Sequence, residues 1–383
     1  MFKVYNTLKD LASGLSQFLK LAIPDIRKTQ LKIIPFIVIG MILSESVVAS
    51  DIAKHLKDEF SLVQLDSVIK RISRFFKNKL FNPYSFYDKI IHYIISNYKV
   101  KHNDNRIHIV FDHMFSHNNY TIFMITMRIG SSGFPLWFRC FKGVSSDAFK
   151  EDMIMDGISY VSNLFGKDYE LIFSADRWFN SIKIMKHIKS LGHIFTLRLR
   201  RNMKLVIYDK KEKRKIWKWV DELTHYSYHS KSYVVYLTEE KYEVTLILSK
   251  KKGTKDPWII VTNGNPKRAV KDYAYRFGAI ETVFKSQKSN GFYLESTCNA
   301  SIEYFTSMYT IACFAQTYMT ILGADFAKNR RCYRNVKITT HKNRNGKKVR
   351  TMSLFNTGLT LFHLAYMSLK YIRIPFNFKL YDV

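Results

Sequence analysis

The succession of strand-like and helix-like segments between residues 106 and 199 restricts the fold more than any other feature of the sequence. Three strand-like segments come first, and the turn Gly-Ser-Ser-Gly at 130–133 joins the second to the third. Helix-like and strand-like segments then alternate. In chain order the segments are 106–111, 120–129, 134–141, 148–165, 170–175, 181–191 and 193–199. The first three strands are expected to pair as antiparallel hairpins.

The order βββαβαβ is that of the ribonuclease-H-like fold, in which the first strand lies beside the strand that follows the first helix. An aspartate comes directly after each of these two strands, at Asp112 and Asp176. Because neighbouring strands present their ends together, we expect these two carboxylates to meet. The predicted fold class is mixed α/β with a ribonuclease-H-like core.

Regions of different character surround this core. Residues up to about 97 show helical spacing, whereas 203–263 contains five strand-like segments joined by Lys-rich and Gly-containing turns. We therefore expect an all-β insertion within the core and helical regions at both ends of the chain. The predicted domains are 1–100 (helical, DNA-binding), 101–202 with 264–325 (ribonuclease-H-like core), 203–263 (β-strand insertion) and 326–383 (basic and helical C-terminal region).

A glutamate in a later helical segment, Glu281, is the candidate for a third ligand. Two strand-end aspartates and a helical glutamate form the hard oxygen set that Mg²⁺ or Mn²⁺ prefers. Two such ions about 3.5–4 Å apart can activate the attacking oxygen and stabilise the leaving oxygen in phosphodiester chemistry. Asp112, Asp176 and Glu281 are therefore predicted to be catalytic and to bind two metal ions.

The surroundings of Glu281 add basic and aromatic candidates. A helix is predicted from Pro266 through Glu281 to about residue 287, and it carries Tyr273 and Arg276, with Lys288 at its end. An arginine and a lysine beside a metal-binding carboxylate can hold the phosphates on either side of a scissile bond. Taken alone, a Glu and a Lys seven residues apart on a helix are more often a solvent-facing pair.

The chain resembles the DDE transposases of the insertion-sequence-4 type over roughly residues 30–330. The resemblance depends on 109–112 (Ile-Val-Phe-Asp), on 174–179 (Ser-Ala-Asp-Arg-Trp-Phe), and on 273–291. The family signature is Tyr, two residues, Arg, three residues, Glu, six residues, Lys. The Tyr-to-Arg and Glu-to-Lys spacings match, while four residues rather than three separate Arg276 from Glu281.

The resemblance implies cut-and-paste transposition, in which a homodimer binds the terminal inverted repeats of a mobile DNA element. Strands are cleaved with Mg²⁺ or Mn²⁺ and joined to target DNA, often through a DNA hairpin. A hairpin requires an extruded base, and Trp178 is a candidate stacking platform; the alternative is a buried core tryptophan. Arg177 is a candidate phosphate contact.

Two other functions stay open at this point. One is a catalytically silent, transposase-derived protein that only binds DNA, and the other is a ribonuclease-H-like DNA nuclease without strand transfer.

The charge of the chain favours a polyanionic partner. There are 61 Lys and Arg against 31 Asp and Glu, a net charge of +30. Segments 48–56 and 65–76 suit a helix-turn-helix whose second helix carries Lys70, Arg71 and Arg74; the alternative is a helical bundle with a solvent-facing basic side. The run 328–350 holds ten Lys or Arg and no acid, so it is a further candidate for DNA contact or a solvated linker.

A membrane, a secretory route and a zinc site are not indicated. The longest apolar run, 33–43, is well short of the roughly 20 residues of a spanning helix, and no signal peptide is visible. We therefore expect a cytoplasmic, nucleoid-associated protein with reduced, mostly buried cysteines. His113 and His117 lack further Cys or His partners for zinc, and Asp147, Glu151 and Asp152 are expected to cap a helix.

Overall fold

The computed structural model describes most of the chain. Its described residues are 7–57, 64–98, 105–116, 119–143, 150–209, 213–223, 231–237, 242–250, 257–289, 291–296, 301–329, 340–342, 348–350, 352–367 and 380. Among the predicted features, His117, Asp147, Cys298, Cys332 and most of 328–350 lie outside the described residues.

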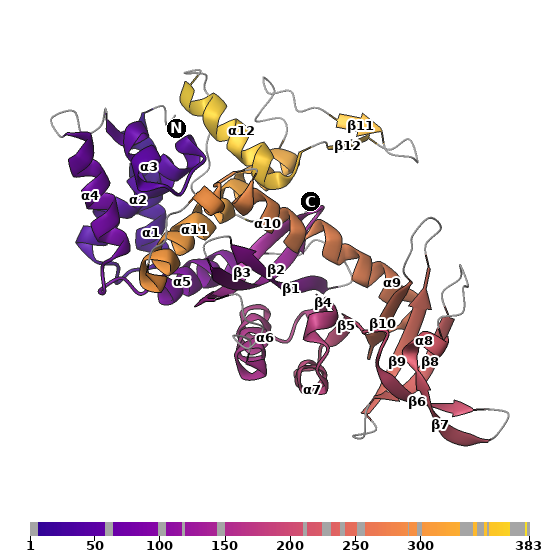
Figure 1. The fold of residues 1–383 in the computed structure, drawn as a ribbon. Helices are drawn as coiled ribbons and strands as arrows, with labels where there is room; N and C mark the ends of the chain where they lie inside the picture. The colour runs from indigo at the N-terminus through magenta and orange to yellow at the C-terminus, as the bar shows by residue number, and fades with distance from the viewer. Residues whose placement is uncertain are drawn as a thin grey trace.

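The N-terminal region is helical, as the spacing of its apolar residues predicts (Figure 1). Its helices pack on the long, almost fully buried helix α11 (Ile302–Lys328): Phe18 stacks on Phe314 with ring centroids 5.9 Å apart, and Phe76 meets Tyr304 at 5.2 Å. The helices of this region are α1 (Leu8–Ala22), α2 (Lys28–Ser44), α3 (Ala49–Leu56), α4 (Leu65–Phe76) and α5 (Pro83–Ser96).

The apolar run 33–43 lies inside α2 and is mostly buried. In the described part of the chain no single helix is long and apolar enough to cross a membrane, and only α2 and α3 taken together, bent by 100°, meet the length and composition test.

A mixed sheet passes through the centre of the molecule. Among the described residues it has ten strands in the order β3-β2-β1-β4-β5-β10-β9-β8-β6-β7. The strands are β1 (Arg106–Ser116), β2 (Tyr120–Ile129), β3 (Ser132–Lys142), β4 (Glu170–Ala175), β5 (Ile194–Arg198), β6 (Lys204–Asp209), β7 (Arg214–Trp219), β8 (Lys231–Leu237), β9 (Tyr242–Ser249) and β10 (Trp258–Thr262).

The predicted pairing of the core strands is confirmed. β1, β2 and β3 form an antiparallel meander, and β1 runs parallel to β4, which runs parallel to β5. The strands predicted in 203–263 are also present, and they continue the same sheet because β10 pairs with β5 and β9 pairs with β10. The boundaries of an insertion domain stay a prediction.

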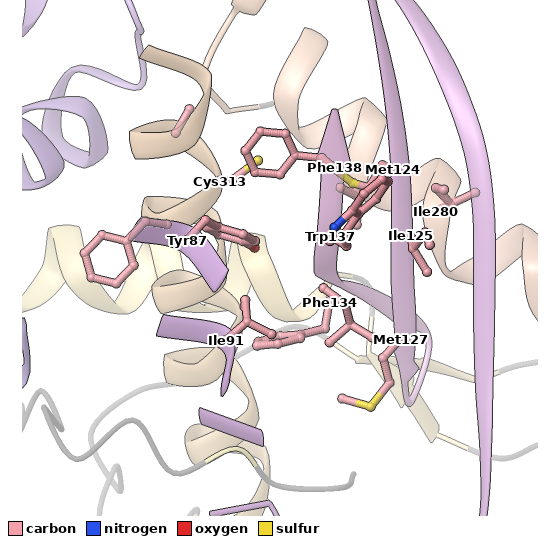
Figure 2. Close-up of a cluster of buried hydrophobic side chains, with 14 of the residues drawn as sticks. Tyr87, Ile91, Met124, Ile125, Met127, Phe134, Trp137, Phe138, Ile280 and Cys313 are labelled. Atoms are coloured by element: carbon pink, nitrogen blue, oxygen red, sulfur yellow. The ribbon is translucent and has the colours of Figure 1, made fainter. Parts of the chain in front are cut away.

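Helices cover both faces of the meander. Phe138 of β3 contacts Tyr87 of α5 and Tyr309 of α11, with ring centroids 5.2 and 5.0 Å away (Figure 2). The preceding Trp137 points to the opposite face, where an added Cβ on Gly157 of α6 would lie 2.9 Å from its ring. Successive side chains of a strand point to opposite faces, so Trp137 and Phe138 are buried on opposite sides of the sheet. The remaining helices are α6 (Glu151–Phe165), α7 (Ile182–Ser190), α8 (Val220–Leu223), α9 (Pro266–Ala274), α10 (Ile280–Lys288) and α12 (Leu354–Met367).

The helix predicted from residue 266 to about 287 is wrong as a continuous element. It is divided into α9, a short 3₁₀ helix at Tyr275–Gly278, and α10. Ala279, with φ −98° and ψ −87°, is not helical, and Gly278 approaches the backbone of the turn before β3, where an added Cβ would lie 3.3 Å from the Ser131 carbonyl oxygen. The break allows α10 to take a direction of its own against β3.

Buried charges attach α9 to the beginning of β1. Asp272 of α9 is 4% exposed and accepts a hydrogen bond from Arg106 Nη2 at 3.4 Å. His108 Nε2 lies 3.9 Å from the other Asp272 oxygen. Burial, and then the charges of nearby arginines, lower the pKa of His108 to about 3, so its imidazole is neutral and this contact is not an ion pair.

This neutral histidine predicts a loss of stability in acid. The unfolded imidazole takes up a proton near its ordinary pKa of 6.5 while the folded one stays neutral down to about 3, so falling pH favours unfolding across this window. We expect His108 to cost the wild type about 2 kcal/mol of unfolding free energy between pH 8 and pH 5. Denaturant unfolding of the wild type and of His108→Gln at pH 8 and pH 5 measures this loss. The variant should lose less unfolding free energy on acidification, by the contribution of His108. An equal loss of unfolding free energy in both proteins would contradict the prediction.

Candidate functional site

The sheet brings Asp112 and Asp176 together, as the strand order predicts. The parallel register of β1 and β4 ends with Phe111 opposite Ala175, so the next residue of each strand is an aspartate. Their side chains are 16% and 25% exposed. These two carboxylates therefore lie side by side at one edge of the β1–β4 pair.

The prediction that the first strand ends at Asp112 is wrong. β1 continues to Ser116, because residues 112–116 still pair with 120–124 of β2 after the contact with β4 has ended. Asp112 is therefore held on a continuous strand, and its Oδ1 accepts the His113 backbone N–H at 2.9 Å. Asp176 follows the end of β4 and caps the 3₁₀ helix Arg177–Phe179, accepting the Arg177 N–H at 2.7 Å.

Arg276 joins the three predicted ligands. Its Nη2 donates a short hydrogen bond to Asp112 Oδ2 and lies 3.9 Å from Asp176 Oδ2. Its Nη1 lies 3.9 Å from Glu281 Oε1. The guanidinium is almost fully buried. Three separate elements, β1, the end of β4 and α10, each supply one of the carboxylates around it. We call Asp112, Asp176, Glu281 and Arg276 the carboxylate cluster.

The carboxylate cluster contains more negative than positive charge. Burial is the main reason that the pKa of Glu281 is raised. Arg276 acts to lower this pKa, and repulsion by Asp112 and Asp176 acts to raise it. Burial disfavours the charge of Arg276, but Asp112, Tyr273 and Asp176 outweigh it and raise the pKa of Arg276. One guanidinium offsets one of three carboxylates, so the cluster attracts further cations.

The donor set of the carboxylate cluster fits a hard divalent cation. Carboxylate oxygens are the ligands that Mg²⁺ and Mn²⁺ prefer, and the uncompensated charge here is of the matching sign. In the arrangement described, the Arg276 guanidinium takes the place where the carboxylates converge. In the described ranges no group of three or more Asp, Glu, His or Cys side chains is arranged so that it could hold a metal ion.

Close packing against β3 positions Glu281 on α10. Gly133 of β3 donates its N–H to Thr282 Oγ1 at 3.1 Å, and an added Cβ there would lie 2.5 Å from the Ala279 carbonyl oxygen and 2.6 Å from Val283 Cγ2. At the other end of α10, buried Gln287 donates to Gln316 of α11 at 2.7 Å and accepts from Tyr309 at 2.7 Å. Both contacts determine where Glu281 lies relative to the two aspartates.

Substituting Gly133 by alanine should displace α10. The new methyl group meets backbone atoms that cannot rotate away, so we expect a loss of about 1–3 kcal/mol in unfolding free energy. A shift of about 1 Å at Glu281 should lower any activity of the carboxylate cluster by about 100-fold. Denaturant unfolding and a DNA cleavage assay measure the two effects.

Gly157→Ala on α6 is the matched control, because its added Cβ would lie 2.9 Å from side-chain atoms of Ile125 and Trp137 rather than against backbone atoms of α10. It should reduce stability without a comparable effect on cleavage. Equal effects of both substitutions on cleavage would contradict a positioning role for Gly133.

The other predicted site residues are placed differently. Tyr273 is fully buried against Trp258, with ring centroids 5.4 Å apart, and Lys288 Nζ lies 3.3 Å from Glu295 Oε1. Arg177 is exposed and Trp178 is 59% exposed, so Trp178 is not a core tryptophan. Contact of these four residues with DNA stays a prediction.

A pocket opens beside residues that are close in sequence to the two aspartates, although neither aspartate lines it. It has a volume of about 580 Å³ and is lined by aromatic rings and a few polar groups. His113 and Trp178, each close in sequence to one of the aspartates, line it, and the Arg200 guanidinium lies 5.1 Å from the Trp178 ring centre. Burial lowers the pKa of His113 in spite of Asp112 and Asp176. A flat aromatic group of nucleobase size fits this volume.

The remaining predicted candidates are not part of the carboxylate cluster, although Glu151 lines the pocket with His113 and Trp178. Lys70, Arg71 and Arg74 are on the exposed side of α4, which packs on α3 as a second helix. Glu151 and Asp152 are in the first turn of α6, as predicted, and the N-terminal end of a helix favours such acidic groups. Cys140 and Cys313 are buried free thiols.

Two features of the site were not anticipated. The position of Arg276 inside the carboxylate cluster and the close approach at Gly133 both depend on tertiary contacts. A signal for the first was present, since the sequence places an arginine only five residues before Glu281. Gly133 appeared only as a turn residue.

The chain matches no protein-family model and no curated protein. Among solved structures it is similar to a piggyBac transposase synaptic complex with hairpin DNA, at 15% identity and a TM-score of 0.45, over 97% of this chain and 80% of that chain. A likeness of this degree does not identify a family.

Proposed function

We propose that the chain is a DNA transposase of the insertion-sequence-4 type, which binds terminal inverted repeats and catalyses metal-dependent strand cleavage and strand transfer. The observation that carries the proposal is the convergence of Asp112, Asp176 and Glu281 on one guanidinium from three separate elements. Such a set is suited to phosphodiester chemistry with divalent ions.

The strand order supports a ribonuclease-H-like core. The sequence β3-β2-β1-β4-β5, antiparallel in the meander and parallel from β1 to β5, is the arrangement that βββαβαβ implies. It puts the two aspartates on neighbouring strands, where a metal site of this kind needs them.

The roles of the side chains follow from their positions. Asp112, Asp176 and Glu281 would hold two Mg²⁺ or Mn²⁺ ions, which supply activation of the attacking oxygen and stabilisation of the leaving oxygen. Arg276 orients the carboxylates with which it pairs. Arg177, exposed beside Asp176, and Lys288 at the end of α10 bind backbone phosphates.

The pocket lined by His113 and Trp178 suits an extruded base. Trp178 presents an exposed ring to it, and a base that leaves the stack when a hairpin forms can pack on that ring. The exposed basic side of α4 is proposed to bind the terminal repeats, with a homodimer holding two ends.

A catalytically silent DNA-binding protein is the second candidate. The observation in its favour is that Arg276 is hydrogen-bonded within the carboxylate cluster, where a metal would lie. If a metal ion could not displace the Arg276 guanidinium, the protein would bind DNA without cleaving it.

One experiment separates these functions. The purified full chain is incubated with Mg²⁺, labelled DNA carrying the inverted repeats that flank the coding region, and a target plasmid. A transposase yields a free 3′-hydroxyl at the repeat end and a joined product. Cut DNA without joined product indicates a nuclease, and repeat-specific binding without cutting indicates the silent protein.

A further inference from the structure

Strands β6 and β7 lie at the end of the sheet farthest from the helical N-terminal region (Figure 1). Large aromatic side chains are exposed on these strands. On β6 and β7, Tyr208 is 54% exposed, Trp217 53% and Trp219 43%. Val234 on the adjacent β8 is 57% exposed. Exposure of two tryptophans within three residues is unusual for a solvated strand, since large apolar side chains gather on a surface mainly where something binds.

The strand register places these rings on one face. Trp217 is opposite Val206 and Trp219 is opposite Lys204, while Tyr208 is opposite Lys215. Directly opposed residues point to the same side of a sheet. The alternate residues, such as Leu205, are buried against the core, so the aromatic face is the outer one. We call Lys204, Tyr208, Lys215, Trp217, Trp219, Val234 and Tyr236 the aromatic–basic face.

Lysines are interleaved with the rings. Lys204 Nζ lies 4.6 Å from the centre of the Trp219 ring, and Lys215 Nζ lies 3.8 Å from that of Tyr236. Acidic residues are also near: Glu243 is opposite Tyr236, and Glu222 Oε1 accepts the Trp219 backbone N–H at 3.3 Å. Same-face residues two apart on a strand are about 7 Å apart, so each ring has a lysine within reach of a neighbouring phosphate.

We propose that the aromatic–basic face binds single-stranded DNA, with unpaired bases stacked on Trp217 and Trp219 and phosphates held by Lys204 and Lys215. The identity of the nucleic acid as DNA rests on the proposed function. Flat exposed rings can stack only on bases that are not already paired and stacked, so the face suits an unpaired strand rather than a duplex.

A second copy of this chain is a poorer occupant. The face carries lysines on a chain of net charge +30, so two such faces would repel each other. The edge strand β7 also carries Arg214, Lys215 and Lys218, and charged edge strands resist pairing with another copy. A polyanion gains from the same charges.

The test measures binding without catalysis. Fluorescence anisotropy in EDTA compares a labelled 20-nucleotide oligothymidine with a 20-base-pair duplex, using the full chain. For Trp217→Ala/Trp219→Ala the dissociation constant for the single strand should rise about 10- to 100-fold, and that for the duplex about threefold or less. Trp217→Phe/Trp219→Phe should retain most of the affinity, because phenylalanine still offers a ring.

Two further variants sharpen the result. Lys204→Gln/Lys215→Gln should reduce the salt dependence of single-strand binding by about 0.7 in log–log slope per lost phosphate contact. Tyr293→Ala, which removes a 48% exposed aromatic elsewhere, should change neither affinity.

Unchanged single-strand affinity in the double alanine variant would overturn the inference, as would equal losses for single strand and duplex. Loss of self-association with unchanged DNA binding would instead assign the face to a second copy. Because these measurements use EDTA, they do not depend on DNA cleavage. A wild type that binds the single strand as expected but cleaves no DNA with Mg²⁺ would contradict only the proposed function.

Discussion

Asp112→Asn is expected to lower the rate of DNA strand cleavage on the order of 10³-fold, because a metal ion contributes several kcal/mol to the transition state. The asparagine keeps the shape of the side chain but has one oxygen, so it can keep only one of the two hydrogen bonds that Asp112 accepts on separate oxygens, from Arg276 and from the His113 N–H. The pairing of β1 with β2 still holds the strand in place. Binding of the inverted-repeat DNA should therefore change little. Single-turnover cleavage and electrophoretic mobility shift measure the two quantities.

Asp272→Asn is the matched control for this prediction. Asp272 is also a buried aspartate that accepts from an arginine, but it lies at the beginning of β1 beside Arg106, outside the carboxylate cluster. Its substitution should reduce stability and leave the cleavage rate of the folded protein within about threefold of the wild type. Wild-type cleavage by Asp112→Asn would remove Asp112 from the site.

Arg276→Gln is expected to destabilise the protein in EDTA by about 2–4 kcal/mol, since removing one partner of a buried ion pair leaves the other charge uncompensated. The lower end of that range reflects Glu281, whose side chain is 51% exposed. Mn²⁺ should restore much of the loss, because a divalent cation can take the place of the guanidinium among the carboxylates. Denaturant unfolding with EDTA and with Mn²⁺ measures this difference.

The wild type should gain less stability from Mn²⁺ than Arg276→Gln, because its own guanidinium competes for the same place. Arg276→Lys keeps a positive charge and should lie between them. If Mn²⁺ stabilised wild type and Arg276→Gln equally, the guanidinium and the metal would not share a site.

Some strands could be predicted from the sequence because their limits are set by neighbouring residues along the chain. β2 and β4 begin and end at the predicted residues, since each is an apolar run with turn residues on both sides. The neighbouring positions of Asp112 and Asp176 followed from strand order, which is a property of the chain as a whole.

Other features depend on contacts that no local pattern contains. Residues 112–116 remain in β1 because β2 supplies a partner, and the helix after Pro266 breaks because Gly278 approaches the turn before β3. The burial of Arg276 requires three elements to converge on it. From sequence it was expected to contact phosphate, and whether it does so when DNA is bound stays a prediction.

The central claim is that Asp112, Asp176 and Glu281 bind the metal ions of a DNA-cleaving site, and a change of metal preference tests it most directly. Cleavage of inverted-repeat DNA by Asp176→Cys is measured in Mg²⁺ and in Mn²⁺. A thiolate is a poor ligand for Mg²⁺ and a better one for softer ions. We expect no detectable cleavage in Mg²⁺ and recovery in Mn²⁺ to within about tenfold of the wild type. Equal cleavage by Asp176→Cys in both metals would contradict direct binding of metal by Asp176.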